Sequence, residues 1–293
     1  MKEYDYKKVD AFTSKGSMGN PAAFLMLHDA KMSDEQFLAI GREHAGFVSE
    51  VVFCTDSDRA DYKLTYYSSQ CEVDFCGHGT VAAMYEVIRN DKKLLHKAEI
   101  LFDTNKKGIL SVYNRLQEED AIYITAPKAQ QLQVPVNHEQ IAKALGIQIA
   151  DMQNASPVDF IDAGLRTLIV PILKLEKEIS VYPNEPCLKE FCLNNGIDII
   201  LIFCMDTAAK ECFAHTRVFA PKFGYLEDPA TGSGNSAFAN YLIKNKMWDG
   251  SPIGVEQGGD NILYNTIKLM KQEEYILFGG RATLRIVGKY IVE

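Results

Sequence analysis

Residues 72–88 read Glu72-Val-Asp-Phe-Cys-Gly-His-Gly-Thr-Val-Ala-Ala-Met-Tyr-Glu-Val-Ile88. Two glycines flank His78, and the apolar residues after them have helical spacing, which predicts a helix that begins at the glycines. The first backbone N–H groups of such a helix lack partners within it and favour an anion. With Glu72 and Asp74 just before it, a titratable histidine there indicates proton transfer on an acidic substrate. A helix cap with a structural histidine is the alternative.

The same pattern returns in residues 226–243, Leu226-Glu-Asp-Pro-Ala-Thr-Gly-Ser-Gly-Asn-Ser-Ala-Phe-Ala-Asn-Tyr-Leu-Ile243. Its glycines align with those of the first stretch, Gly232 with Gly77 and Gly234 with Gly79. The strands predicted before the two stretches also correspond at an offset of 150 residues, in the pairs Gly46 and Gly196, Phe53 and Phe203, and Cys54 and Cys204. These matches indicate an internal duplication.

The composition argues against several classes of partner and cofactor. The net charge of −8 and the pI near 5.4 argue against nucleic acid or an anionic membrane as a partner. The seven cysteines include no Cys-x-x-Cys pair, and no His/Cys spacing resembles a zinc site, so neither a metal nor a cofactor is predicted. A charged N-terminus and the lack of a long apolar run favour a cytoplasmic protein.

Each half of the sequence contains many predicted strands and few long helices, which indicates a sheet curled around one long helix. The N-terminal half covers residues 1–127 and the C-terminal half residues 128–293, with the final strand able to cross back to the N-terminal half. Pro127 and the stretch Gln130–Pro135 are predicted to form the linker. The last segments of the chain are expected to be antiparallel strands.

Two differences between the copies bear directly on the chemistry. Glu50 lies in an apolar strand where the second copy has Ile200, and a carboxylate there is costly unless it is paired or used. An edge-strand glutamate pointing at water is the other interpretation. Cys76 precedes the first glycine, but the second copy has Thr231, so racemisation by two opposed thiols is disfavoured. Cys76 is therefore expected to be mainly a packing residue.

Several segments together resemble the phenazine-biosynthesis PhzF-like isomerases along almost the whole chain. They are Asp10–Thr13, Gly19–Ala23, Ser49-Glu50, Glu72–Thr80, Arg217–Pro221, Glu227–Ser233 and Phe278–Ala282. The resemblance implies an α+β fold of the diaminopimelate-epimerase type. In it, two pseudo-symmetric halves each form a barrel-like, mostly antiparallel sheet wrapped around a central helix, with the active site between them.

The resemblance also implies the site and the reaction. Glu50 would be the single acid/base that moves a proton within a small carboxylate substrate, without cofactor or metal. The characterised family member isomerises trans-2,3-dihydro-3-hydroxyanthranilate, and a homodimer is implied. The other implied catalytic residues are His78, Asp228 and Ser233, and the substrate-binding residues are Gly77, Gly79, Gly232, Gly234 and Asn20.

The residues leave two alternative functions open. Cys-Gly-His-Gly opposite a Thr-Gly turn also suits a hydroxy-amino-acid dehydratase or a racemase of the proline-racemase type. A non-catalytic binder of small acids built on the same fold is the second alternative. Replacing Glu50 separates these classes, because a binder keeps its affinity whereas the isomerase loses turnover.

Overall fold

The computed structural model describes residues 1–259 and 263–292. The chain forms two compact units, Met1–Thr125 with Gly279–Glu293, and Ala126–Phe278. In the first unit the elements are β1 (Lys2–Ala11), β2 (Asn20–His28), α1 (Asp34–Glu43), β3 (Glu50–Thr55), β4 (Tyr62–Ser68), β5 (Glu72–Val73), α2 (Gly77–Asn90), η1 (Leu94–His96), β6 (Glu99–Thr104), β7 (Gly108–Arg115), α3 (Leu116–Glu119), β8 (Ala121–Thr125) and β18 (Ala282–Val292).

In the second unit the elements are β9 (Gln130–Leu132), α4 (His138–Leu145), η2 (Ile149–Asp151), β10 (Asp159–Asp162), β11 (Arg166–Pro171), α5 (Leu175–Ser180), α6 (Glu185–Asn194), β12 (Ile199–Cys204), β13 (Ala214–Phe219), η3 (Pro221–Phe223), β14 (Glu227–Asp228), α7 (Gly232–Lys244), β15 (Ile253–Gln257) and β16 (Asn265–Gln272). Strand β17 (Tyr275–Gly280) connects the two units along the chain. Of the helices in the described residues, none combines the length and the apolar character needed to cross a membrane.

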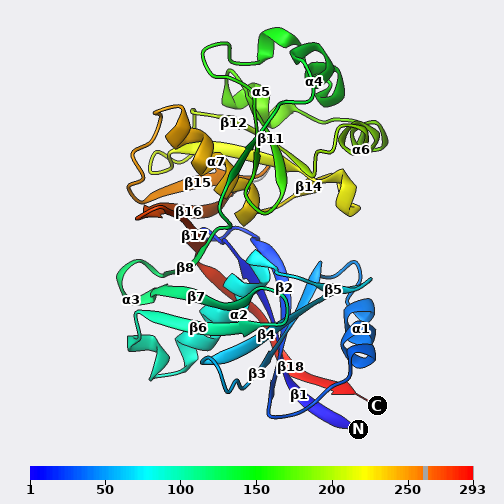
Figure 1. Cartoon of the computed structure of the whole chain (residues 1–293), viewed down its shortest axis with the longest axis vertical. Coiled ribbons are helices and arrows are strands. Elements are labelled where there is room, and N and C mark those ends of the chain that lie inside the picture. Colours follow the sequence, from blue (N-terminus) through cyan, green and yellow to red (C-terminus); the bar gives the residue numbers. More distant parts are fainter. Residues whose placement is uncertain (260–262, 293) are drawn as a thin grey trace. The chain divides into compact units, whose positions relative to one another are not determined.

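The sheet of the first unit has the order β18, β1, β2, β3, β4, β6, β7, β8, and β5 adds a short pairing on β4. Two neighbouring pairs, β2–β3 and β4–β6, are parallel, and the others are antiparallel. Helix α2 packs against both ends of this order, β18 and β8, and against β1, β2 and β3 between them. The sheet therefore curls around α2 (Figure 1).

The second unit repeats this plan in the order β9, β10, β11, β12, β13, β15, β16. Again two pairs, β11–β12 and β13–β15, are parallel. Helix α7 packs against β10, β11, β12 and β16, as α2 does in the first unit. The predicted fold is confirmed: each unit is a mixed, mostly antiparallel sheet around a central helix.

The strand register also confirms that Glu50 and Ile200 are equivalent. In the first unit β3 pairs with β4 so that Glu50 faces Ser68. In the second unit β12 pairs with β13 so that Ile200 faces Phe219. Glu50 is not on an edge strand, because β3 has β2 on one side and β4 on the other.

The first and last strands of the chain are neighbours. Strand β1 pairs with β18 from Lys2 opposite Val292 to Ala11 opposite Ala282, and Figure 1 shows the blue and red arrows side by side. The charged residues before Val9 hide the strand pattern of β1 in the sequence. Tyr4 is nevertheless buried in the core between α1 and the sheet, so the strand starts near the N-terminus.

Two further expectations were wrong, and one helix was missed. The stretch Gln130–Pro135 is not only a linker, since β9 pairs with β10 within it. The last segments are not all antiparallel, because β15 runs parallel to β13. Helix α4 was missed, although Asn137 and Gln140 form a capping box at its start.

Candidate functional site

The site in the first unit is built on the start of α2. Cys76 is the N-cap residue, and its Sγ accepts a hydrogen bond from the backbone N–H of Gly79 at 3.3 Å. Within the described residues, the N–H groups of Gly77 and His78 have no acceptor. These two donors and the helix dipole favour a negatively charged group at this turn.

Glu50 reaches the same turn from the first residue of β3. Its Oε2 lies 3.6 Å from the Sγ of Cys76 and 3.4 Å from the Nε2 of His78. The Sγ of Cys76 is also 3.5 Å from the Nδ1 of His78, so the three side chains contact one another. The side chains of Glu50 and His78 are 20% and 15% exposed, which leaves both accessible to a small molecule.

His78 is neutral at pH 7. Burial lowers the pKa of its imidazole to about 4, because the charged form loses its hydration. Its contact with Glu50 is therefore not an attraction between opposite charges at that pH. A neutral imidazole donates a hydrogen bond from one ring nitrogen and accepts one at the other, which suits a group that helps to relay or orient a proton.

The acidic residues before the turn do not join this cluster, contrary to expectation. Glu72 accepts a hydrogen bond from Asn105 and lies 3.6 Å from the ammonium of Lys106. The carboxylate of Asp74 is 65% exposed and lies 3.8 Å from Lys107. Both carboxylates make surface ion pairs with the β6–β7 turn, which the sequence pattern did not reveal.

Asn20 is the first residue of β2 and is 2% exposed. Since Ala23 pairs with Val51, the next residue after Glu50, Asn20 lies at the same end of the sheet as Glu50. Among the predicted site residues, the first unit thus contains Asn20, Glu50, His78 and the two glycines of the α2 turn.

The predicted residues Asp228 and Ser233 belong to the second unit, at the start of α7. Thr231 is the N-cap residue there, and its hydroxyl donates a hydrogen bond to the carboxylate of Asp228. Gln257 holds the same turn, since its amide donates to the carbonyl of Asp228 and accepts from the N–H of Thr231. Asn235 also donates to Gln257, at 2.8 Å. Sequence analysis missed Gln257, and no local pattern could have found it, because it lies 26 residues beyond Thr231.

The start of α7 also presents free donors. Within the described residues, the N–H groups of Gly232, Ser233 and Gly234 have no acceptor. Ser233 at this turn is half-buried. Both predicted anion-binding turns therefore have the free N–H groups that such a role requires.

Gly79 and Gly232 are also required by packing. A Cβ on Gly79 would lie 2.8 Å from a methyl group of Val52 and 2.9 Å from the Sγ of Cys76. On Gly232 it would lie 2.2 Å from the ring of Phe278. Gly234 has more room, since the nearest atom would be 3.2 Å away, on Ile199.

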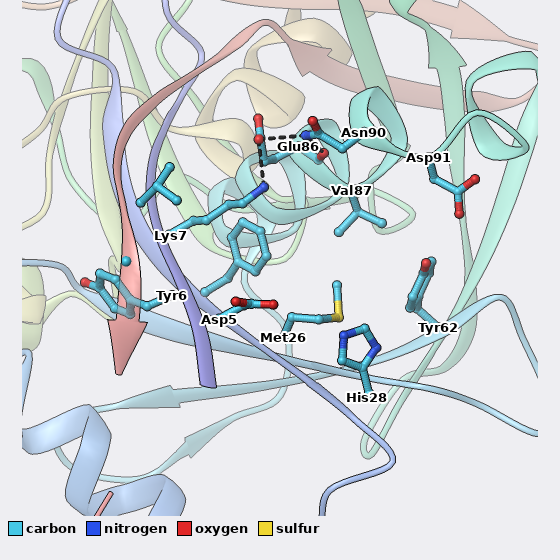
Figure 2. Close-up of a pocket in the computed structure, with 13 residues that line it drawn as sticks. Asp5, Tyr6, Lys7, Met26, His28, Tyr62, Glu86, Val87, Asn90 and Asp91 are labelled. Atoms are coloured by element: carbon cyan, nitrogen blue, oxygen red, sulfur yellow. Dashed lines mark hydrogen bonds and ion pairs between the residues drawn. The ribbon is translucent and has the colours of Figure 1, made fainter. Parts of the chain in front are cut away.

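A separate cavity of about 270 Å³ lies at the other end of α2. Figure 2 shows its polar wall, where Lys7 and Asn90 both point at the carboxylate of Glu86. Lys7 donates to that carboxylate at 2.9 Å and Asn90 at 2.7 Å. Among the described residues that line this cavity there is no predicted site residue, and its buried carboxylate is already paired, so it is not the candidate site.

The chain matches a known protein family over most of its length. Residues 9–288 match the sequence profile of a family described as phenazine biosynthesis-like protein. The chain belongs to this family. It is 32% identical over 246 residues to the uncharacterized isomerase YfhB of Bacillus subtilis, covering 83% of this chain and 82% of that protein. An uncharacterized isomerase of Pseudomonas aeruginosa is 28% identical over 282 residues, 96% of each chain.

Solved structures agree with the family assignment. The PhzF-family phenazine biosynthesis protein of Bacillus anthracis superposes with a TM-score of 0.86 at 26% identity, covering all of both chains. A hydroxyproline epimerase of Agrobacterium vitis superposes with a TM-score of 0.61 at 11% identity, covering 99% of this chain and 91% of that one. At that identity the second likeness shows the fold alone.

Proposed function

We propose that this phenazine biosynthesis-like protein is an isomerase that moves a proton within a small carboxylate substrate, with Glu50 as its single acid/base. One observation carries the proposal. The Glu50 carboxylate contacts His78 and Cys76 at a helix start with free N–H groups, whereas the equivalent position in the second unit is the apolar Ile200. The isomerase names of relatives that align over most of their length support the same reaction class.

In this proposal the carboxylate of Glu50 carries out both steps of the proton transfer. The carboxylate of Glu50 takes a proton from one substrate carbon, and the electron pair left behind is delocalised toward an adjacent unsaturated or carboxyl group. The protonated Glu50 then returns the proton to a second carbon, so the substrate is rearranged and the enzyme is unchanged. Because one group serves both steps, no second base is needed, and no cofactor enters this mechanism.

The remaining predicted residues are assigned to substrate binding and orientation. The free N–H groups at Gly77 and His78, and those at Gly232 to Gly234, suit carboxylate oxygens of the substrate. The neutral imidazole of His78 donates to or accepts from a substrate polar group next to Glu50. Asp228 and Asn20 are proposed to orient the substrate. The resemblance also favours a homodimer, which sedimentation velocity of the purified protein tests.

A thiol-based reaction of the proline-racemase type is a second candidate, for one specific reason. The Sγ of Cys76 lies within 3.6 Å of both Glu50 and His78, an arrangement that also suits an activated thiol. Thr231 at the equivalent position of the second unit argues against a two-thiol mechanism.

The deciding experiment is proton exchange in heavy water. The purified protein is incubated with a panel of small carboxylic acids that includes trans-2,3-dihydro-3-hydroxyanthranilate, and deuterium incorporation and isomer formation are followed by NMR. We expect exchange with at least one acid, loss of exchange in Glu50→Gln, and normal exchange in the control Glu72→Gln. Binding of an acid without exchange in the unmodified protein would support the non-catalytic binder instead.

A further inference from the structure

Glu50, Cys76 and His78 are also residues of the kinds that bind metal ions, and their ligand atoms lie close together. A tetrahedral zinc ion binds Cys at about 2.3 Å and His or carboxylate at about 2.0–2.2 Å. With these bond lengths, sulfur lies about 3.5 Å from the nitrogen or oxygen ligand, and nitrogen lies about 3.4 Å from oxygen. These separations can be compared directly with those in the cluster.

The cluster has nearly these separations before any metal binds. The Sγ of Cys76 is 3.6 Å from the Oε2 of Glu50 and 3.9 Å from the Nε2 of His78. That nitrogen is 3.4 Å from the same Oε2. The largest difference from the tetrahedral separations is about 0.4 Å, for the distance between the sulfur and the nitrogen. A small rotation of the imidazole removes this difference.

We propose that Cys76, His78 and Glu50 form a three-ligand site for a zinc-like divalent cation. These three residues are also the one group in the described chain whose Cys, His and carboxylate ligand atoms lie close enough together to share an ion. The thiolate and imidazole select zinc, cobalt or cadmium over magnesium or calcium, which prefer oxygen ligands. The fourth position is left to a water molecule or substrate, as in zinc sites with three protein ligands.

The surroundings suit this role. The N–H of Gly79 donates to the Sγ of Cys76, and such a hydrogen bond stabilises a bound thiolate. Binding releases the thiol proton to solvent, while the neutral imidazole and the carboxylate each donate an electron pair to the metal. The second unit provides a natural comparison, because Ile200, Thr231 and Ser233 stand where the three ligands are and cannot form such a site.

A metal ion bound at Glu50 would also affect activity, a consequence that rests on the proposed function. A metal ion on the Oε2 of Glu50 occupies the electron pair that takes the substrate proton. Zinc is therefore expected to be a reversible inhibitor of proton transfer, relieved by a chelator, rather than a cofactor.

Cobalt(II) titration of the full chain tests the site without any substrate. To reduce background, the exposed thiols Cys71 and Cys187 are replaced by serine. We expect about one equivalent of cobalt, with near-ultraviolet thiolate-to-metal absorption and the visible bands of a tetrahedral ion, both removed by zinc. Cys76→Ser and His78→Asn should weaken binding by more than about 100-fold, and Glu50→Gln by at least about tenfold. Glu72→Gln is the control that should bind normally.

The outcomes are decisive in both directions. Circular dichroism confirms that each variant is folded, and Cys76→Ser retains an acceptor for the Gly79 N–H. Cobalt absorption that survives in Cys76→Ser or His78→Asn, or a folded protein with no cobalt binding at 1 mM metal, roughly the weak limit of specific sites, would overturn the site. A protein that binds cobalt but exchanges substrate protons equally well under saturating zinc would overturn the inhibition alone. A protein without any exchange activity would refute the proposed function and leave the spectroscopic result intact.

Discussion

Glu50 and Ile200 occupy the same position in two copies of one strand pair. Glu50 faces Ser68 across β3 and β4, and Ile200 faces Phe219 across β12 and β13. The fold therefore requires no carboxylate at this position, since an isoleucine serves in the other copy. The carboxylate that stands there contacts two other reactive side chains at the start of α2.

Replacing Glu50 by glutamine should remove proton transfer and preserve the fold. General acid–base groups contribute about 10²–10⁴-fold to rate, and we expect a loss of that size in deuterium exchange. The amide keeps nearly the same shape, so the thermal midpoint should change little. Glu72→Gln, which alters a surface ion pair beside the same turn, should exchange normally; full exchange by Glu50→Gln would refute the assignment.

Cys76→Ala should cost stability more than turnover. The substitution removes the N-cap acceptor for the Gly79 N–H, and loss of a helix cap costs about 0.5–2 kcal/mol of unfolding free energy. Cys76→Ser should recover most of that loss, because its hydroxyl can accept the same bond. Urea denaturation and exchange rates measure the two effects separately. An alanine variant as inactive as Glu50→Gln would make the thiol catalytic and favour the racemase or dehydratase reaction.

His78 should make the protein acid-sensitive. Its folded pKa of about 4 lies below the ordinary value of 6.5, so the unfolded chain binds the proton more readily. The neutral histidine therefore lowers the free energy of unfolding only below about pH 6.5. The loss grows as the pH drops towards 4 and reaches up to about 3 kcal/mol from this one residue. His78→Asn should lose less stability than the natural protein over that interval. The surface variant His138→Asn is the control, and parallel pH curves for the natural protein and His78→Asn would contradict the prediction.

The two equivalent glycines Gly79 and Gly234 should respond differently to alanine. In Gly79→Ala the new Cβ collides with Val52 and the Cys76 thiol, so we expect a destabilisation of about 1–3 kcal/mol. In Gly234→Ala the nearest contact is 3.2 Å from a flexible isoleucine end, and the higher helix propensity of alanine offsets the crowding. Chemical denaturation of both variants measures the difference. Equal losses would show that the modest crowding at Gly234 is as costly as the clash at Gly79.

The sequence predicted the features that repeat. The two Gly-rich helix starts located both central helices, and the offset of 150 residues between the strands singled out Glu50 by comparison with Ile200. Both capping residues of α4, Asn137 and Gln140, were also available in the sequence, so that helix was overlooked rather than hidden.

The rest depended on contacts between distant residues. Nothing local shows that Cys76 lies against Glu50, 26 residues earlier, and the thiol was assigned mainly to packing. In the same way, Glu72 finds Asn105 only because β4 and β6 are neighbours. The start of strand β1 cannot be recognised in the sequence, because lysines on its accessible face interrupt the apolar pattern that marks a strand.

The pairing of β1 with β18 sets the order in which the chain can mature on the ribosome. The second unit is one continuous segment, Ala126–Phe278, and is fully translated before β18. Until then β1 has an unpaired edge, and the first unit, although synthesised first, waits for the last dozen residues. Released chains truncated before β18 would thus keep the whole second unit and an open, aggregation-prone first one.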